Sequence, residues 1–167
     1  MRNRSYPVPH LPRTQFEKLL EALTVLGIIT VLAMTVWGWL ILPAIIPTHY
    51  GISGAPSAYG GKENLLIAPI ISICLSVLLT FLSRYPRLYN YPWRITAENA
   101  VRQYSLARLF LHWFALEIVW MFCGLQWIVI QEAQGPLTDP ISLIIPASAL
   151  TLILTIILYI CIAARAR

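Results

Sequence analysis

The chain has 167 residues, of which 58% are apolar and 11% are charged, with a formal net charge of +5. Soluble domains carry about 45–50% apolar and about 25% charged residues, so this composition excludes a soluble domain, a disordered chain and a disulfide scaffold. It indicates an integral membrane protein, and the length suits a single transmembrane domain over residues 1–167.

Four apolar stretches follow an N-terminal tail at residues 1–13. A helix needs about 20 apolar residues to cross the hydrocarbon core of a bilayer. The stretches cover residues 22–46, 65–83, 109–130 and 141–164. We therefore expect an all-α fold, a polytopic four-helix transmembrane bundle with an ordered external loop between its first two helices.

Several residues mark where these helices begin and end. Residues 14–21 form an amphipathic lead-in to the first span, and Pro43 is expected to end or kink that helix. Thr96 is suited to N-cap the third helix, with Glu98 in its first turn. The third helix therefore begins well before its apolar stretch and extends beyond the hydrocarbon core.

Basic residues gather beside the ends of the apolar stretches. If the spans alternate, one side of the membrane holds Arg2, Arg4, Arg13, Lys18, Arg84, Arg87, Arg94, Arg102, Arg108, Arg165 and Arg167. The other side holds Lys62. By the positive-inside rule, this division predicts that both termini and the central loop are cytoplasmic. The same placement argues against nucleic acid as a partner.

The first external loop, residues 42–62, is the least regular part of the sequence. Two prolines stop the preceding helix, His49 and Tyr50 follow, and glycines suited to tight turns precede Lys62. We expect an ordered loop at the outer membrane surface. His49, Tyr50 and Lys62 are candidate ligand- or partner-binding residues, although packing and headgroup contacts account for the same pattern, with Lys62 snorkelling.

Glu117 is the carboxylate inside the third span, near the expected midplane. A central charge costs roughly 2.5–3.5 kcal/mol, so such residues usually face the bundle interior. Glu117 is therefore a candidate for proton transfer or cation binding, or a structural hydrogen-bond acceptor. The available partners on other helices are Thr30, Thr35, Ser76, Trp37 and Trp39. Gln126, on the opposite side of the same helix, is a further candidate that can meet the His49 loop.

No metal site and no cofactor are expected. His49 and His112 lie on opposite sides of the membrane and cannot bind one ion, and His112 is expected to be an interfacial residue. Cys74, Cys123 and Cys161 lie in or beside apolar runs, where a thiol acts as a small hydrophobe. A nucleophile elbow, a phosphate loop and paired carboxylates are all missing from the sequence, so catalysis is not favoured.

The first external loop also carries a family pattern. The pattern LPxxIPxHxxxxGxPxxxGxK is formed by Leu42, Pro43, Ile46, Pro47, His49, Gly54, Pro56, Gly60 and Lys62. It resembles the motif of the DUF1648 family, a domain of unknown function that also begins the SdpI-type immunity proteins of bacteria. Residues 89–104 are similar to short members of this family. Tyr50-Gly51 stands where the family pattern has Phe-Asn.

The resemblance implies a small membrane protein of the bacterial cytoplasmic membrane that works by binding, as an immunity-like or accessory factor. Its ligand would engage the outer loop or grooves between spans. The lipid bilayer is its expected surrounding. Another protein or a second copy of the chain is a candidate partner, since Gly27 and Gly124 permit close helix contacts. Two alternatives stay open: a membrane-embedded enzyme or ion-coupled carrier using Glu117 and His49, and a structural subunit of a larger complex.

Overall fold

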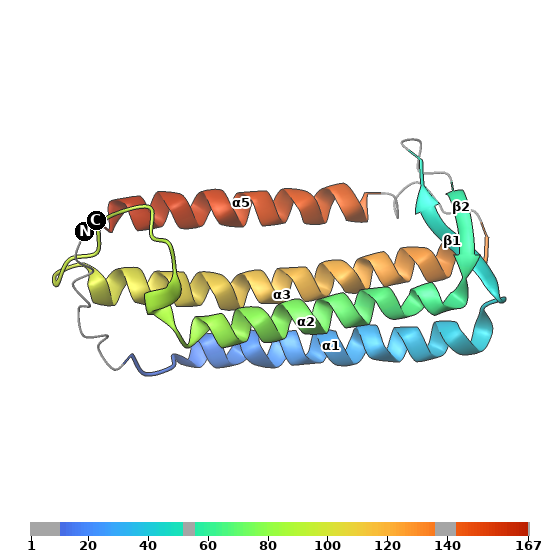
Figure 1. Ribbon diagram of the computed structural model, residues 1–167, viewed down its shortest axis with the longest axis horizontal. Helices are drawn as coiled ribbons and strands as arrows, with labels where there is room; N and C mark the ends of the chain where they lie inside the picture. The colour runs from blue at the N-terminus through green and yellow to red at the C-terminus, as the bar shows by residue number, and fades with distance from the viewer. Residues whose placement is uncertain (1–10, 52–55, 136–142, 167) are drawn as a thin grey trace.

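A computed structural model describes residues 11–51, 56–135 and 143–166. Four long helices lie side by side (Figure 1): α1 (Gln15–Ile41), α2 (Ile67–Ser83), α3 (Ala100–Glu132) and α5 (Ile144–Arg165). A 3-10 helix, η1 (Lys62–Leu66), leads into α2. All four helices, α2 together with η1, are long and apolar enough to cross a membrane. The described part of the chain is thus a four-helix, multi-pass membrane protein, as predicted.

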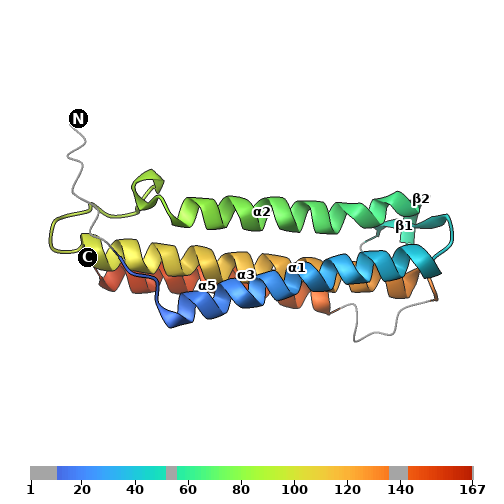
Figure 2. The same cartoon turned by 90° about the horizontal axis from the view of Figure 1, so that it is seen from below.

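Helix α3 is the centre of the bundle. Helices α1 and α2 both pack along it, and α5 packs on another side of it (Figures 1 and 2). Only 6% of the most apolar part of α5 is buried inside the molecule, which suits a helix that faces lipid. In the view of Figure 2, the gap between α1 and α2 is wider at the end where α1 begins than at the other end.

A capping box fixes the start of α1. The Thr14 hydroxyl accepts a hydrogen bond from the Glu17 amide (3.1 Å), and the Glu17 carboxylate accepts one from the Thr14 amide (2.8 Å). The box satisfies N–H groups that a helix end otherwise leaves unpaired. The helix therefore includes the predicted lead-in. It ends at Ile41, two residues before Pro43, so the predicted span 22–46 extends too far at its C-terminal end.

The loop between α1 and α2 is a β-hairpin, formed by β1 (Ile45–Tyr50) and β2 (Pro56–Gly61) paired antiparallel. The pairing is irregular after Pro47, a residue that has no amide proton to donate. The hairpin covers the end of the bundle (Figure 1) through a buried apolar cluster. This cluster consists of Leu42, Ile46, Leu65 and Ile130. The expected loop is therefore ordered, and it is a small sheet.

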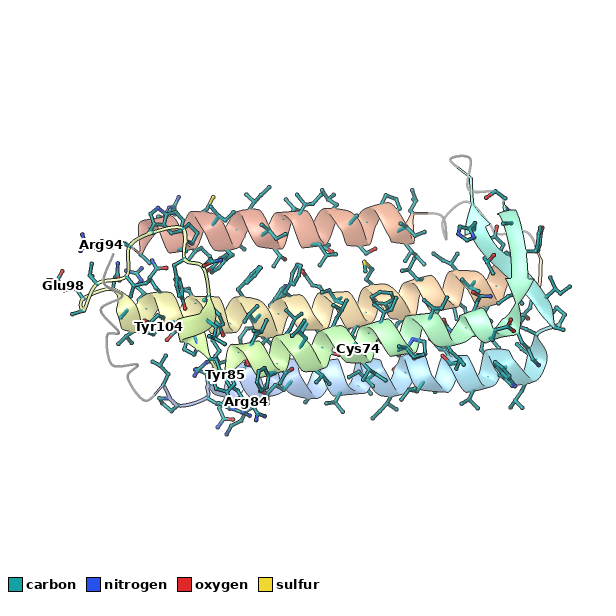
Figure 3. The ribbon with its side chains drawn as sticks, viewed as in Figure 1. Cys74, Arg84, Tyr85, Arg94, Glu98 and Tyr104 are labelled. Carbon is teal, nitrogen blue, oxygen red and sulfur yellow. The ribbon has the colours of Figure 1, made fainter. Side chains whose placement is uncertain are left out.

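We call this end of the bundle the hairpin end, and the opposite end, where α1 begins and α5 finishes, the basic end. Figure 3 shows Arg84, Arg94 and Glu98 at the basic end. Helix α3 begins there at Ala100, later than the predicted N-cap at Thr96. Thr96 instead exchanges two hydrogen bonds with Asn99, of 2.8 and 3.3 Å, one turn before the helix. Thr96 thus stabilises a turn directly before α3.

Two tyrosines brace the chain between α2 and α3. The Tyr89 hydroxyl donates to the Leu82 carbonyl (2.7 Å) and the Tyr91 hydroxyl donates to the Pro86 carbonyl (2.9 Å). Burial raises the pKa of Tyr89 to about 12, so its hydroxyl keeps the proton that this hydrogen bond uses. The segment is therefore held against the end of α2.

Candidate functional site

The structure describes the side chains of two of the three candidate residues of the outer loop, Lys62 and His49, and these two contact different neighbours. The Lys62 ammonium donates to the Trp39 carbonyl (3.1 Å) and lies 5.0 Å from the centre of the Trp39 ring. His49 is exposed, with Nδ1 3.4 Å from the Thr48 hydroxyl. Tyr50 lies in β1, and its side chain is outside the described part of the structure. Lys62 therefore joins the hairpin to the last turn of α1.

Among the residues that the structure describes, the Gln126 amide contacts α1 and η1 instead of the His49 loop. Its side chain is 2% exposed and its Nε2 donates to the Thr35 hydroxyl (3.1 Å) and to the Leu65 carbonyl (3.2 Å). The Leu65 carbonyl is available because Pro69, four residues later, has no amide proton. Gln126 thus supplies the hydrogen bond that this proline removes from the start of α2.

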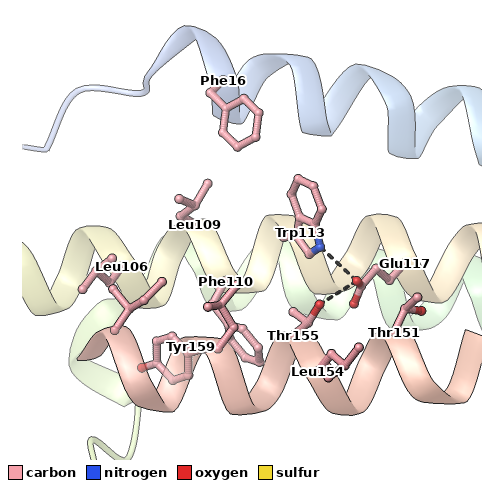
Figure 4. Close-up of a pocket in the computed structure, with 12 residues that line it drawn as sticks. Phe16, Leu106, Leu109, Phe110, Trp113, Glu117, Thr151, Leu154, Thr155 and Tyr159 are labelled. Atoms are coloured by element: carbon pink, nitrogen blue, oxygen red, sulfur yellow. Dashed lines mark hydrogen bonds between the residues drawn. The ribbon is translucent and has the colours of Figure 1, made fainter. Parts of the chain in front are cut away.

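Glu117 faces α5, and the predicted partners on the first two spans are wrong. Its Oε1 accepts one hydrogen bond from the Trp113 indole (2.9 Å) and another from the Thr155 hydroxyl (2.6 Å), as Figure 4 shows. Its Oε2 is buried and has no hydrogen-bond partner among the described residues. The prediction failed because α1 and α2 pack on other sides of α3.

Glu117 lies in a groove of about 380 Å³ between α3 and α5 (Figure 4). The lining is aliphatic, aromatic and threonine side chains apart from this one carboxylate. It consists of Phe16, Leu106, Leu109, Phe110, Trp113, Thr151, Leu154, Thr155, Leu158, Tyr159 and Ile162. Leu154 and Leu158 are more than half exposed, and Phe16, Trp113 and Ile162 are exposed to a smaller degree. The groove is therefore open along its length to the surrounding lipid.

The structure does not bring His49 and Glu117 together. Glu117 lies 15 residues before the end of α3, which is about 22 Å along the helix at 1.5 Å per residue. The groove around Glu117 contains no hairpin residue. Among the residues that the structure describes, no three His, Cys, Asp or Glu side chains lie close enough to hold a metal ion.

A buried ion pair that the sequence did not predict lies at the basic end. Arg108 donates to both carboxylate oxygens of Glu17, at 2.7 and 3.0 Å, and the two side chains are 12% and 3% exposed. The remaining donors of Arg108 reach the carbonyls of Leu11 (2.8 Å) and Pro12 (3.0 Å). Glu17 therefore caps α1, and with Arg108 it ties α1 to α3.

A second polar pair, His112 and Glu21, lies one helical turn farther from the basic end than Arg108 and Glu17. His112 Nε2 is 3.7 Å from Glu21, and the Glu21 carboxylate also accepts from Arg13 at 3.2 Å. His112 is 5% exposed, so its side chain packs inside the bundle; its depth in the membrane stays a prediction. The sequence did contain a signal. Glu17 and Glu21 are four residues apart, as are Arg108 and His112, so each pair shares one helix face.

Comparison with known proteins finds a family match over part of the chain. Residues 26–73 match the family described as "Domain of unknown function (DUF1648)", a region that spans most of α1, the hairpin and the start of α2. An uncharacterised protein of Archaeoglobus fulgidus is 39% identical over 59 residues, which cover 30% of this chain and 32% of that protein. The chain thus aligns with about a third of this relative's length. No solved structure matches it significantly.

The family match confirms the resemblance carried by the hairpin. Residues 89–104 lie outside the matched region, so the second resemblance stays a prediction, as does the relation to SdpI-type proteins. The relative comes from an archaeon, so a bacterial source also stays a prediction. Neither match names an activity, a ligand or a partner for the residues described above.

Proposed function

We propose that this membrane protein works by binding a hydrophobic molecule in the groove between α3 and α5. The molecule carries a hydrogen-bond donor, an amine or a hydroxyl, at the end that reaches Glu117. The observation that supports this proposal is the Glu117 carboxylate, whose Oε2 lacks a partner inside an otherwise apolar groove. An immunity-like role is the special case in which the bound molecule is membrane-active.

The dimensions of the groove support binding of one such molecule. Its volume of about 380 Å³ lies within the range of about 300–1,000 Å³ that small-molecule sites occupy. Trp113 and Thr155 hold one carboxylate oxygen in place, so the other keeps a fixed position. A bound amine or hydroxyl would satisfy that oxygen, which is costly to leave unpaired when it is buried.

The proposal includes a location and an orientation. We place the chain in the cytoplasmic membrane with the basic end in the cytoplasm. This orientation is supported by the described basic residues, which lie at the basic end apart from Lys62, because cytoplasmic segments carry the excess of Lys and Arg. The ligand would then enter from the lipid beside α5, and its polar end would reach the interior of the bundle.

Bromine-labelled dodecylamine tests the binding site, since bromine quenches the fluorescence of a nearby indole and Trp113 lines the groove. We expect the amine to quench the protein saturably and bromododecane to bind about tenfold more weakly. Glu117→Gln should weaken binding of the amine by about tenfold, because a hydrogen bond to a charged group contributes about 1.5–3 kcal/mol.

Two control variants make this result specific. Glu98→Gln makes the same chemical change at an exposed position outside the groove (Figure 3) and should leave binding unchanged. Trp113→Phe should remove most of the quenching. Equal binding of the amine by wild type and Glu117→Gln, or equal binding of the amine and the bromoalkane by wild type, would contradict the proposed function.

A further inference from the structure

A second cavity lies on the other side of α3, between α1 and α2 near the basic end (Figure 2). Its volume is about 410 Å³, and its lining comes from α1, α2, α3 and Arg13 just before α1. A smaller cavity of about 170 Å³ shares Arg13, Arg84 and His112 with it and extends to the end of the bundle. We call the two together the basic cleft. It contains no residue of the α3–α5 groove.

The charges in the basic cleft do not balance. Arg108 is neutralised by Glu17, and Arg13 is paired with Glu21. Arg84, at the end of α2 (Figure 3), is exposed, and its guanidinium makes no hydrogen bond or ion pair with any residue that the structure describes. Arg84 therefore leaves one positive charge at the mouth of the cleft.

Arg13 is a second source of hydrogen-bond donors at the mouth of the cleft. One of its nitrogens pairs with Glu21, and its side chain remains 45% exposed. A guanidinium has five N–H donors in a fork that suits phosphate oxygens. Arg13 and Arg84 line both cavities, so one anionic group at the mouth can reach donors from the start of α1 and the end of α2.

The deeper part of the basic cleft combines apolar side chains with the small polar side chains of Thr24, Ser76 and Thr80. Val25 and Ile28 form its wall on α1, and Val77 and Phe81 form its wall on α2. Val25, Val77 and Phe81 are each more than half exposed. Val77 precedes Arg84 by seven residues and Val25 follows Arg13 by twelve. These separations are about 10 and 18 Å along the helices at 1.5 Å per residue, a depth that suits the upper part of an acyl chain.

We infer that the basic cleft binds an anionic phospholipid from the leaflet at the basic end. The phosphate lies between Arg84 and Arg13, and an acyl chain lies between α1 and α2 against Val25 and Val77. The combination of an unbalanced arginine at the mouth with exposed apolar side chains deeper in the cleft selects a lipid over a free anion. Basic pockets between helices on the cytoplasmic side recognise acidic headgroups in this way.

Native mass spectrometry of the full chain in mild detergent tests this inference. Dioleoylphosphatidylglycerol and dioleoylphosphatidylcholine are titrated separately, and the fraction of protein that retains one lipid is measured. We expect the anionic lipid to bind at least fivefold more tightly. Arg84→Gln should weaken its binding about fivefold, since each basic residue contributes about 1 kcal/mol to such binding.

Two further variants and a competition with inorganic phosphate complete the test. Arg94→Gln removes the same charge from an exposed site outside the cleft and should change binding less than twofold. Val77→Trp keeps both arginines but fills the apolar wall, and should also weaken binding. Inorganic phosphate at millimolar concentration should not displace the lipid. Equal binding of the two lipids, equal effects of the two arginine variants, or displacement by phosphate would overturn the inference.

The inference does not depend on the proposed function, because the basic cleft and the α3–α5 groove share no residue. Glu117→Gln should leave lipid retention unchanged, and Arg84→Gln should leave quenching by the brominated amine unchanged. Each proposal can therefore fail while the other stands.

Discussion

Arg108→Gln is expected to lower the free energy of unfolding by about 3–5 kcal/mol, because it leaves the Glu17 carboxylate buried without its cation. Glu17 is 2% exposed and is held by Arg108 at 2.7 and 3.0 Å. The measurement is unfolding of the purified protein in mixed micelles by increasing mole fraction of dodecyl sulfate, followed by tryptophan fluorescence.

Two comparisons separate loss of this pair from a general loss of charge. Arg13→Gln breaks an ion pair whose arginine is 45% exposed and should cost no more than about 1 kcal/mol. The double variant Arg108→Gln with Glu17→Gln removes the uncompensated charge and should recover much of the lost stability. An Arg108→Gln protein as stable as Arg13→Gln would show that the buried pair does not hold α1 on α3.

Gly27→Val has the second large effect that we expect. A Cβ atom at Gly27 would lie 2.6 Å from Cγ1 of Val119 and 3.3 Å from Nε1 of Trp120, so the Val119 side chain or the two helices must shift. Overpacking of this kind costs about 1–3 kcal/mol or more. The same unfolding measurement applies, and Val119→Ala in the Gly27→Val background should restore part of the loss.

Ala33→Val is the matched control for this prediction, because Ala33 is an exposed residue on the same helix. It introduces the same β-branched side chain on the lipid-facing side of α1 and should change the stability little. If Gly27→Val and Ala33→Val have equal stability, the close approach of α1 to α3 at Gly27 does not contribute to the bundle.

The sequence predicts the helices well, because a bilayer imposes a length and a composition that each span must meet. It also predicts that Pro43 ends or kinks the first helix, and α1 ends two residues before it. The observed bounds of α1 differ from the predicted ones at both ends. The capping box of Thr14 and Glu17 starts α1 before the apolar stretch, and the hairpin takes residues 45 and 46, which hydropathy alone assigns to the helix.

The partners of polar residues were harder to predict, because they depend on which helices pack together. Glu117 contacts α5 through Thr155, and Gln126 contacts η1 through the Leu65 carbonyl. Hydropathy does not determine the order in which four apolar helices surround one another. The Arg108–Glu17 pair was missed for the same reason, since it depends on the packing of the start of α1 against α3.

The central claim is that the chain crosses the membrane with the hairpin and the basic end on opposite sides. Tyr59 in β2 and Arg94 before α3 are both exposed, so each can be replaced by Cys in a background where Cys74, Cys123 and Cys161 are Ala. A membrane-impermeant maleimide added to intact cells should label Tyr59→Cys and leave Arg94→Cys unlabelled until the cells are opened. Labelling of both positions in intact cells, or of neither, would contradict the account.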